Sequence, residues 1–547
     1  MCGVVLAQWF HSSEWICAMN VHTAGLRRGV VAAPHHAAVA AGREILAEGG
    51  NALEAMLAMA GVIAAVYPHM NHIGGDGFWL VREPSGRVRA IMAAGRAGAK
   101  ATPAFYREAG HYEVPQRGPL AALTVPGAIA GWIAAARAAE ALGGRLPLDV
   151  LLGSAIGHAR DGFKVVDAIA EAAAGADLKS VTGFADTFFI DGKPPEEGAA
   201  LRQPKLAETL AYLVNAGLPD FYKGDVGREM AADLERIGSP VTRADIERCE
   251  ATIAEPLSVK LACGTLYNTG APTQGLASLM ILALFERLKV REAEGFDHIH
   301  GLVEATKRAF LIRDRFITDP AQMERPASSF LEAAVLDREA AKIDMRKAAP
   351  WPGGVGDADT VWMGAADASG LVVSYIQSIY WEFGSGVVLP RTGVLMQNRG
   401  CAFSLETGAA RLLAPGRLPF HTLNPALAVL NDGRVMAYGT RGGDGQPQTQ
   451  AVVFSRHVLF RQPLDVAIEA PRWVLGRTWG ESRDDLRFEA RFDGTLLDRL
   501  QSAGHPVEVF AEDYSHTVGH AGAAIFHPDR TLEGAHDPRS DGGADGV

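Results

Sequence analysis

The order of helix and strand patterns along the chain predicts an α/β protein in which two sheets pack between two layers of helices. Residues from about 30 to 315 are mainly helical, whereas strand patterns dominate after Thr360. Strands are also expected at about 74–95 and 257–268, so strands lie at both ends of a helical middle. Neither part has the pattern of a complete domain, and the simplest packing interleaves them as a four-layer α/β/β/α sandwich.

The helical part begins with two adjacent helices. Residues 35–50 are amphipathic and end in a glycine pair suited to a left-handed cap. The apolar run from Leu53 to Tyr67 predicts a buried second helix, because it carries Glu54 and is too short to span a bilayer. Alanine- and leucine-rich patterns predict further helices at about 127–142, 147–160, 205–215, 228–237, 276–288 and 298–315.

A glycine-rich spacer, residues 353–359, leads into a predicted strand hairpin. Residues 361–366 and 371–379 have strand composition, and Asp-Ala-Ser-Gly between them has turn composition. Thr360 therefore lies where the spacer meets the sheet. From this spacing alone, an ordinary linker before a strand-initial threonine is the simpler interpretation. The other interpretation is a nucleophile that becomes N-terminal when the spacer is cut.

Strand patterns continue after this hairpin, and the chain ends are polar. Strands are expected at 423–430, 434–440 and 486–492, with a helix at about 448–461. Residues 1–28 lack the basic start of a signal peptide, so we expect an extension of a cytoplasmic protein that is either disordered or the product of a mis-called start. Residues 528–547 are expected to form a polar tail. The predicted parts are thus 29–359 and 360–547, which share one composite domain.

Composition and charge exclude several classes of partner. The 547 residues are 48% hydrophobic and 21% charged, which is ordinary for a globular protein. The 52 basic and 63 acidic residues give a net charge of -11 without a long basic run, so neither nucleic acid nor an anionic membrane is an expected partner. The cysteines are odd in number and widely spaced, which argues against disulfides or a zinc cluster and indicates a reducing compartment. They are Cys2, Cys17, Cys249, Cys263 and Cys401.

The glycine-rich loops at 73–78, 383–386 and 439–446 lack the residues of a nucleotide site. None has the Lys-Ser/Thr of a phosphate loop or a strand-to-helix G-x-G-x-x-G with a downstream acid. Adjacent glycines can instead direct N–H groups at a developing oxyanion, which makes Gly442 and Gly443 oxyanion-hole candidates. Simple tight turns explain the same residues equally well.

The histidines do not form a convincing metal or triad pattern. His69 and His72 are spaced like ligands, but only Asp76 lies nearby to complete a site, and Pro68 predicts a loop. We therefore expect hydrogen-bonding roles for them and predict no metal or cofactor. A G-x-S-x-G elbow is also missing from the sequence. Hydrolytic chemistry would need a nucleophile that carries its own base.

Thr360 can meet this need once the bond between Asp359 and Thr360 is cut. The freed α-amine has a reference pKa of about 7.7–8, so it can accept the hydroxyl proton near neutral pH. The same hydroxyl can make the cut by attacking the Asp359 carbonyl in an N-to-O acyl shift, followed by hydrolysis of the ester. One residue would then serve both maturation and turnover.

A series of motifs covers the chain from about residue 30 to residue 527. They are A-A-G-R-E-I-L-A-E-G-G-N-A-L-E-A, H-I-G-G-D-G-F, R-A-G-A-K-A-T-P-A-F-Y, T-V-P-G-A-I-A-G-W, D-T followed by D-A-S-G-L-V-V-S, F-G-S-G-V-V, L-P-F-H-T-L-N-P and G-T-R-G-G-D-G-Q. In content and order they resemble the gamma-glutamyltranspeptidase family of N-terminal nucleophile hydrolases. The resemblance implies an autocatalytically split α/β/β/α protein, and it favours Thr360 as nucleophile over a linker residue.

The resemblance assigns roles to individual residues. Thr360 matches the nucleophile, and Gly442 and Gly443 match the oxyanion-hole pair. Arg96 matches the arginine that grips the substrate carboxylate. Ser378 stands where the family has a second threonine hydrogen-bonded to the nucleophile. The larger processed chain would end at Asp359.

This sequence departs from the family where the family binds the glutamyl group. In place of the usual Asn, acidic or amide, Asp and Ser-pair residues it has Tyr380, Arg399, Ala402, His421 and Thr422. Ala402 removes the counter-ion for a substrate ammonium group, and Arg399 adds positive charge to that of Arg96. Burying an unpaired ammonium there would be costly. The bulk of Tyr380 and Trp381 indicates a short acyl pocket.

These departures predict an amidohydrolase for a small, carboxylate-bearing amide. Q-S-I-Y-W-E-F-G-S-G and Y-P-H-M resemble the oxamate amidohydrolase branch of the family. A gamma-glutamyltransferase or glutathione hydrolase is the alternative enzyme, and an uncleaved, non-catalytic scaffold that binds small acids is the alternative of another class. The expected partners are the small amide and the chain's own two processed parts, with a homo-oligomer left open.

Self-processing is directly testable. The purified protein should give two bands on a denaturing gel, and the smaller should begin at Thr360 on N-terminal sequencing. Thr360→Ala removes the attacking hydroxyl and should give one band and no activity. Cleavage that persists in this variant would refute the self-processing mechanism.

Overall fold

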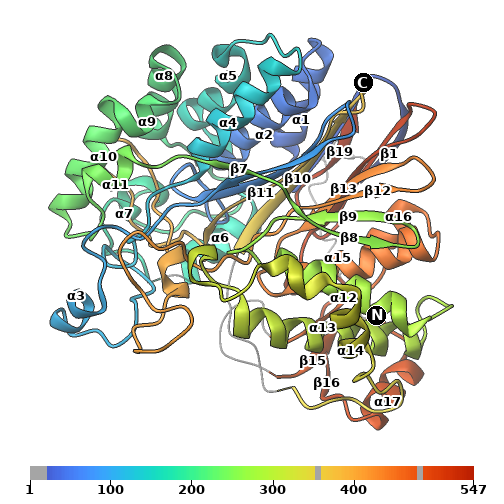
Figure 1. Cartoon of the computed structure of the whole chain (residues 1–547). Helices are drawn as coiled ribbons and strands as arrows, with labels where there is room; N and C mark the ends of the chain where they lie inside the picture. The colour runs from blue at the N-terminus through green and yellow to red at the C-terminus, as the bar shows by residue number, and fades with distance from the viewer. Residues whose placement is uncertain (1–20, 176, 352–358, 477–483) are drawn as a thin grey trace, which may run out of the picture.

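The computed structural model of the chain describes residues 21–175, 177–351, 359–476 and 484–547. Two seven-stranded sheets lie face to face in the middle of the molecule, and helices cover the outer face of each (Figure 1). The predicted four-layer α/β/β/α architecture is confirmed. Residues 1–20 of the predicted extension and 353–358 of the spacer lie outside the described residues.

The sheet that carries Thr360 combines strands from distant parts of the chain. Neighbouring strands are antiparallel, in the order β19 (Gly543–Gly546), β2 (Gly29–Ala33), β10 (Asp359–Asp367), β11 (Val372–Tyr380), β3 (Asp76–Arg82), β4 (Val88–Ala93) and β7 (Thr252–Ala254). β10 and β11 are the predicted hairpin, and β10 is held on both sides, by β2 and β11.

The second sheet is also antiparallel and also mixes early and late segments. Its order is β1 (His22–Leu26), β18 (Leu532–His536), β17 (Ala521–Phe526), β13 (Val435–Thr440), β12 (Ala426–Leu430), β9 (Gly264–Asn268) and β8 (Leu257–Leu261). β10 packs face to face against β13 and β17 of this sheet. Apolar side chains of the two inner faces, Trp362 and Leu427 among them, form the core between the sheets.

Helices cover the two outer faces. The first sheet is covered by α1 (His36–Ala47), α2 (Ala52–Val66) and α4 (Ala128–Ala141), with α5 (Leu148–Asp161) and α8 (Pro204–Ala216) further out. The second is covered by α12 (Gly275–Leu288) and α15 (Gly445–Phe454), with α13 (Phe296–Phe316) packed on both. Each helix layer has its own apolar core against its sheet.

Smaller elements decorate these layers. The helices are α3 (Pro103–Glu108), α6 (Asp167–Gly175), α7 (Phe184–Phe188), α9 (Asp220–Lys223), α10 (Asp225–Arg236), α11 (Arg243–Glu247), α14 (Ala333–Ala340), α16 (Leu464–Glu469) and α17 (Gly494–Ser502). The strands are β5 (Phe163–Lys164), β6 (Ala200–Leu201), β14 (Trp473–Leu475), β15 (Leu486–Phe488) and β16 (Val507–Val509).

Helix α2 shows how a local signal fixes an element. Asn51 caps its first turn by accepting the N–H groups of Leu53 and Glu54, while the Glu54 carboxylate accepts the N–H of Asn51. Every residue from Ala52 to Val66 is buried, because α2 lies between α1, α5 and the sheet. The prediction of a buried apolar helix is confirmed.

Two predictions about the chain ends are wrong. Residues 22–26 form β1, which pairs with β18, so they do not belong to a disordered extension. The predicted polar tail contains β18 and β19, one strand for each sheet. The sequence Gly-Ala-Asp-Gly of β19 has no strand pattern of its own, and its pairing with β2 determines its conformation.

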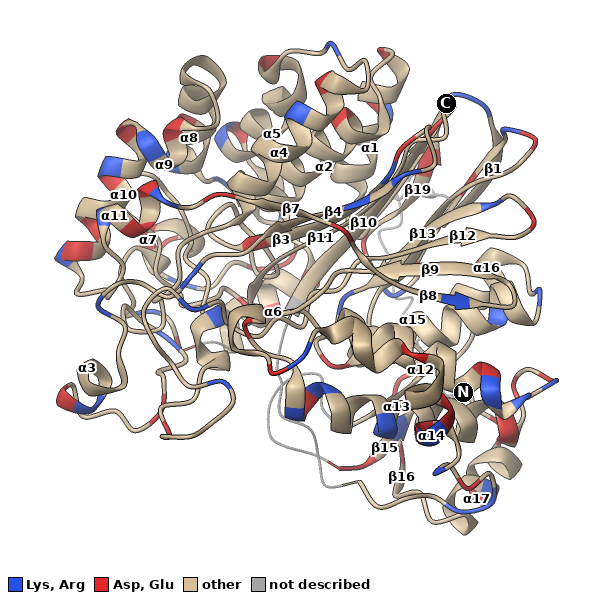
Figure 2. Cartoon of the chain, viewed as in Figure 1, with Lys and Arg blue, Asp and Glu red and all other residues tan. Residues whose placement is uncertain are grey.

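The surface carries charges of both signs in alternation. Figure 2 shows blue and red residues mixed along outer helices such as α10. Within the part of the chain that the structure describes, no helix is both long enough and apolar enough to cross a membrane.

The end of the chain should be essential for stability. Deleting residues 543–547 removes β19 and the Val547 carbonyl that accepts the N–H groups of Arg28 and Gly29. At about 1 kcal/mol for each net hydrogen bond, we expect a loss of about 3 kcal/mol or more in the free energy of unfolding. Chemical denaturation of the full-length and shortened proteins measures this loss. Equal stability would mean that the residues are a dispensable tail.

Candidate active site

Thr360 lies at an irregular point of the central strand pair. Asp359 pairs with Tyr380 but Val361 pairs with Gln377, so Thr360 alone stands opposite two residues, Ser378 and its neighbour. The Thr360 side chain is fully buried. Tyr380 has φ +86°, which is a rare conformation for a bulky residue. The predicted cleavage bond thus enters a β-bulge opposite a strained residue.

The hydroxyl of Thr360 meets the first turn of α15. Gln446 Nε2 donates to Thr360 Oγ at 3.4 Å, and Gln446 Oε1 accepts from Asn424 Nδ2 at 3.0 Å. Asn424 therefore fixes which end of the amide faces the hydroxyl. The positive end of the α15 dipole also lies near Thr360 and favours negative charge there. Ser378 Oγ accepts the N–H of Tyr380 at 2.8 Å, so its hydroxyl is tied to the same bulge.

Gly442 and Gly443 form the turn between β13 and α15. Both have positive φ, +109° and +49°, which explains glycine at each position. Their carbonyls are engaged, since Gly442 accepts the N–H of Gly445 and Gly443 accepts Gln274 Nε2 at 2.8 Å. Neither N–H donates to another described residue. Two N–H groups next to a helix N-terminus suit the predicted oxyanion hole.

A buried ion pair supports this turn from the helix layer. Arg313 of α13 donates to both carboxylate oxygens of Asp444, at 2.9 and 3.0 Å, and to Gln274 Oε1 at 2.8 Å. Gln274 in turn donates to the carbonyls of Gly443 and Thr422. The turn at Gly442 and Gly443 and the Thr422 loop are therefore held by one network, which the sequence did not reveal.

The structure brings together four of the predicted substrate-binding residues. The Arg399 guanidinium lies 3.9 Å from the centre of the Tyr380 ring and donates to Thr422 Oγ at 3.3 Å. Arg399 is 1% exposed, and its Nε and Nη2 have no hydrogen-bond partner among the described residues. Burial lowers the pKa of Arg399 to about 10, so it stays charged at neutral pH. These free donors suit an anionic ligand.

His421 completes this group of residues. Its ring is buried edge-on against Phe78, and its Nε2 lies 3.4 Å from Asp76 Oδ2. Burial and the charge of Arg399 hold the pKa of His421 well below its usual range. The imidazole is therefore neutral at neutral pH.

Asp76 is a member of the site that the sequence reasoning missed. It is fully buried at the start of β3, where Oδ1 accepts the N–H groups of Gly95 and Gly127 at 2.9 and 3.0 Å. Burial raises its pKa to about 7, against the opposing effects of these N–H groups and of Arg399. The pairing of β3 with β11 indicates that Asp76 belongs to the site, because it places Asp76 directly opposite Ser378.

Arg96 and Ala402 are less buried than this group of residues. The Arg96 side chain is 58% exposed, donates to the Gly416 carbonyl at 2.9 Å and approaches Asp319 at 3.8 Å. It lines a surface cavity of about 100 Å³. Ala402 is only partly buried, in a short turn that begins at Arg399. The role predicted for Arg96 stays a prediction.

The histidines expected to form hydrogen bonds are buried. His72 Nδ1 accepts the N–H of Leu395 at 3.1 Å, and His69 packs edge-on against Tyr67. Burial lowers the pKa of His72 to about 3 and holds that of His69 well below its usual range.

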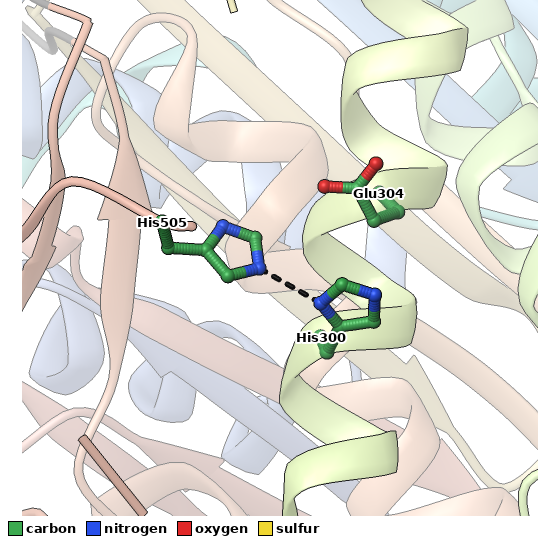
Figure 3. A group of neighbouring side chains, drawn as sticks. All are labelled: His300, Glu304 and His505. Atoms are coloured by element: carbon green, nitrogen blue, oxygen red, sulfur yellow. Dashed lines mark hydrogen bonds between the residues drawn. The ribbon is translucent and has the colours of Figure 1, made fainter. Parts of the chain in front are cut away.

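One other group has the composition of a metal site. Figure 3 shows His300 and Glu304 of α13 facing His505, with His300 Nδ1 2.8 Å from His505 Nε2. The Lys307 ammonium, however, donates to Glu304 at 2.7 Å and to the Ala349 carbonyl. It already supplies the positive charge that the carboxylate needs. This geometry favours a polar contact between α13 and the segment before the spacer.

Comparison with known proteins agrees with this geometry. The family model described as Gamma-glutamyltranspeptidase matches residues 38–547. The chain belongs to the gamma-glutamyltranspeptidase family. It is 51% identical over 521 residues to an oxamate amidohydrolase proenzyme of Klebsiella pneumoniae, covering 95% of this chain and 98% of the relative. It is 36% identical to a glutathione hydrolase-like proenzyme of Bacillus subtilis, covering 97% and 100%.

A solved structure supports the fold assignment. The cephalosporin acylase of Bacillus halodurans is 28% identical, with a TM-score of 0.89 over 99% of both chains. The chain therefore has the N-terminal nucleophile hydrolase fold and is a hydrolase of this family. The residue roles inferred above remain predictions.

Gln446 offers a test of the site geometry. Gln446→Met keeps the length of the side chain but removes the donor to Thr360, so we expect self-cleavage to slow about tenfold, the effect of about 1.4 kcal/mol. Gln448→Met is the matched control, because Gln448 lies on the same helix but donates to the Asp444 and Leu475 carbonyls. Densitometry of precursor and products over time gives both rates. Equal rates would remove Gln446 from the mechanism.

Proposed function

We propose that this chain is a self-processing amidohydrolase that hydrolyses a small carboxylate-bearing amide of the oxamate type through an acyl-enzyme on Thr360. Three observations support the proposal together. Thr360 lies in a β-bulge of a central strand, its hydroxyl meets the helix that follows the Gly442–Gly443 turn, and a buried guanidinium lies against Tyr380 of the paired strand. The 51% identical relative is named for oxamate, which fits this chemistry.

Maturation would begin with attack of Thr360 Oγ on the Asp359 carbonyl carbon. The bond between that carbon and the Thr360 nitrogen breaks, and an ester replaces the amide. Water then hydrolyses the ester, which leaves a carboxylate on Asp359 and a free α-amine on Thr360. The β-bulge at Thr360 supports this step, because the peptide to be cleaved lies where the regular pairing of β10 with β11 is interrupted.

Turnover would reuse the same atoms. Thr360 Oγ attacks the amide carbonyl while the α-amine takes its proton, and the N–H groups of Gly442 and Gly443 stabilise the oxyanion. The protonated amine then gives its proton to the leaving ammonia, which leaves an ester on Thr360. Attack by water, with the amine again as base, releases the carboxylic acid. For oxamate the products are oxalate and ammonia.

The observation that carries the substrate assignment is the free, buried face of Arg399. A charged guanidinium with two unpartnered nitrogens in a dry site gains most from a carboxylate. The Tyr380 ring covers its other side and limits the length of an acyl group. A two-carbon amide acid places its carboxylate next to its reacting carbonyl, which suits a short pocket.

Removal of the guanidinium should lower activity on the amide acid. Arg399→Met is expected to lower kcat/KM for oxamate about 100-fold, since a charge-assisted hydrogen bond contributes about 1.5–3 kcal/mol. Arg315→Met, an exposed residue of α13, is the matched control and should leave kcat/KM unchanged. Ammonia release measured against substrate concentration gives both values. Arg96→Met, assayed beside them, shows whether Arg96 also binds the carboxylate.

Substrate comparison separates the alternatives. The proposal predicts clear turnover of oxamate and weak turnover of γ-glutamyl-p-nitroanilide. The reverse order would favour a gamma-glutamyltransferase or glutathione hydrolase. An intact chain without activity on either would favour the acid-binding scaffold.

A further inference from the structure

Asp76 lies on the same sheet as Thr360, two strands away. Asp76 pairs with Ser378 across β3 and β11, and Ser378 stands opposite Thr360 across β11 and β10. The Cα atoms of Asp76 and Thr360 are two strand spacings apart, a distance of about 10 Å. Phe78, two residues further along β3, lies in the core between the sheets, so Asp76 points to the same inner side. A small substrate between them can reach both residues.

The hydrogen bonds of Asp76 fix one oxygen and leave the other available. Oδ1 is held by two backbone N–H groups, one of them from Gly127 immediately before α4. Oδ2 lies 3.4 Å from His421 Nε2 and has no well-formed partner among the described residues. The carboxyl group therefore keeps its orientation whether or not Oδ2 carries a proton. A proton on Oδ2 could be donated to the neutral His421 ring.

The groups that face Asp76 determine its charge. Arg399 is the cation that acts on it, the Gln397 side chain also favours its ionised form, and His421 is neutral. On the side of the helices lie Tyr222, Cys249 and Tyr375, and the burial of each raises its pKa well above neutral. None of these three groups is charged near pH 7. Asp76 is thus the member of this set that titrates there, and burial raises its pKa to about 7.

Charge balance in the empty site differs from that in the occupied site. Before a ligand binds, Arg399 and ionised Asp76 each favour the charged form of the other. A substrate carboxylate on Arg399 would place two anions beside one cation in a buried site, which strongly disfavours both remaining ionised. The group that can accept a proton at moderate cost is Asp76, through its free Oδ2.

We propose that Asp76 is a specificity-determining residue that takes up one proton from solvent when the substrate carboxylate replaces it as the counter-ion of Arg399. The proton binds Oδ2 and is shared with His421 Nε2, so a monoanionic amide acid enters together with one proton. A zwitterionic γ-glutamyl group would instead need Asp76 ionised, to face its ammonium. The protonation of Asp76 thus sorts monoanions from zwitterions. This inference rests on the proposed function, because it concerns the same pocket.

Proton uptake can be measured without turnover. Pyruvate has a methyl group where oxamate has its amide nitrogen, and it serves as the probe in titration calorimetry at pH 8 in phosphate and in Tris. The difference between the two buffers gives the protons bound. We expect about one proton for each pyruvate bound by the processed wild-type enzyme, because at pH 8 a group of pKa about 7 is about 90% ionised before binding. Uptake near zero would overturn the proposal.

The pH profile separates Asp76 from other groups. Asp76 is ionised above its pKa, so the KM of the wild type for oxamate should rise about tenfold per pH unit above pH 7, whereas the Thr360 amine acts on kcat. Asp76→Asn should make KM independent of pH from 6 to 9. Asp498→Asn, at an exposed position on α17, is the matched control and should keep the wild-type profile. A sloping KM in Asp76→Asn would assign the proton elsewhere.

The two proposals fail in different ways. Pyruvate binding without proton uptake, together with oxamate turnover, would refute the role of Asp76 and leave the amidohydrolase intact. Proton uptake that depends on Asp76, without oxamate turnover, would refute the substrate assignment and keep the charge exchange. Absence of pyruvate binding would overturn both. If Asp76→Asn does not mature, the wild-type calorimetry still decides.

Discussion

The candidate active site depends on the contact between the central strand β10 and the first turn of α15. β10 is hydrogen-bonded to β11 and, from Gly364 to Asp367, to β2, and it packs face to face on β13 and β17, so the strand that carries Thr360 is anchored in the middle of the fold. Trp362, two residues on, fills that core and donates to Ser374 Oγ at 2.9 Å. Gln446 therefore meets a hydroxyl that is already held in place, which is what a preorganised nucleophile requires.

The apolar cores lie between the layers, and the group of residues around Arg399 holds several buried polar atoms without hydrogen-bond partners. Three apolar cores fill the spaces between the four layers. Beside Thr360, by contrast, Arg399, His421 and Asp76 are buried with polar atoms that lack partners among the described residues. Each such group costs about 1–3 kcal/mol. A site of this kind persists because a ligand can satisfy these atoms and the surrounding layers tolerate the cost.

The sequence predicted the features that carry a local pattern. These features are the hairpin after Thr360, the buried helix α2 and the layered architecture. They were predictable because strand composition, helix capping and hydrophobic runs depend on residues that are adjacent in the sequence. β1 and β19 were missed, since their conformation comes from pairing with distant strands. Asp76 was missed for a related reason. The sequence shows only one acid in a glycine-rich loop, and the pairing of β3 with β11 is what brings it to the site. The network from Arg313 to the turn at Gly442 and Gly443 likewise joins residues far apart in the chain.

Ala402 and Asp76 both bear on which charged groups of a substrate the site can accept. Ala402 is expected to remove one carboxylate, but Asp76 supplies another, which is anchored by the N–H groups of Gly95 and Gly127 and acts on the charge of Arg399. A zwitterionic γ-glutamyl group brings a carboxylate for Arg399 as well as an ammonium for ionised Asp76, so its binding would leave Asp76 ionised and take up no proton. A monoanionic amide acid faces the opposite situation, because Arg399 attracts its carboxylate and Asp76 can become neutral. Under the proposal, an amide acid and a glutamyl group therefore differ in whether binding takes up a proton at Asp76, and the bulk of Tyr380 would further limit the length of the acyl group.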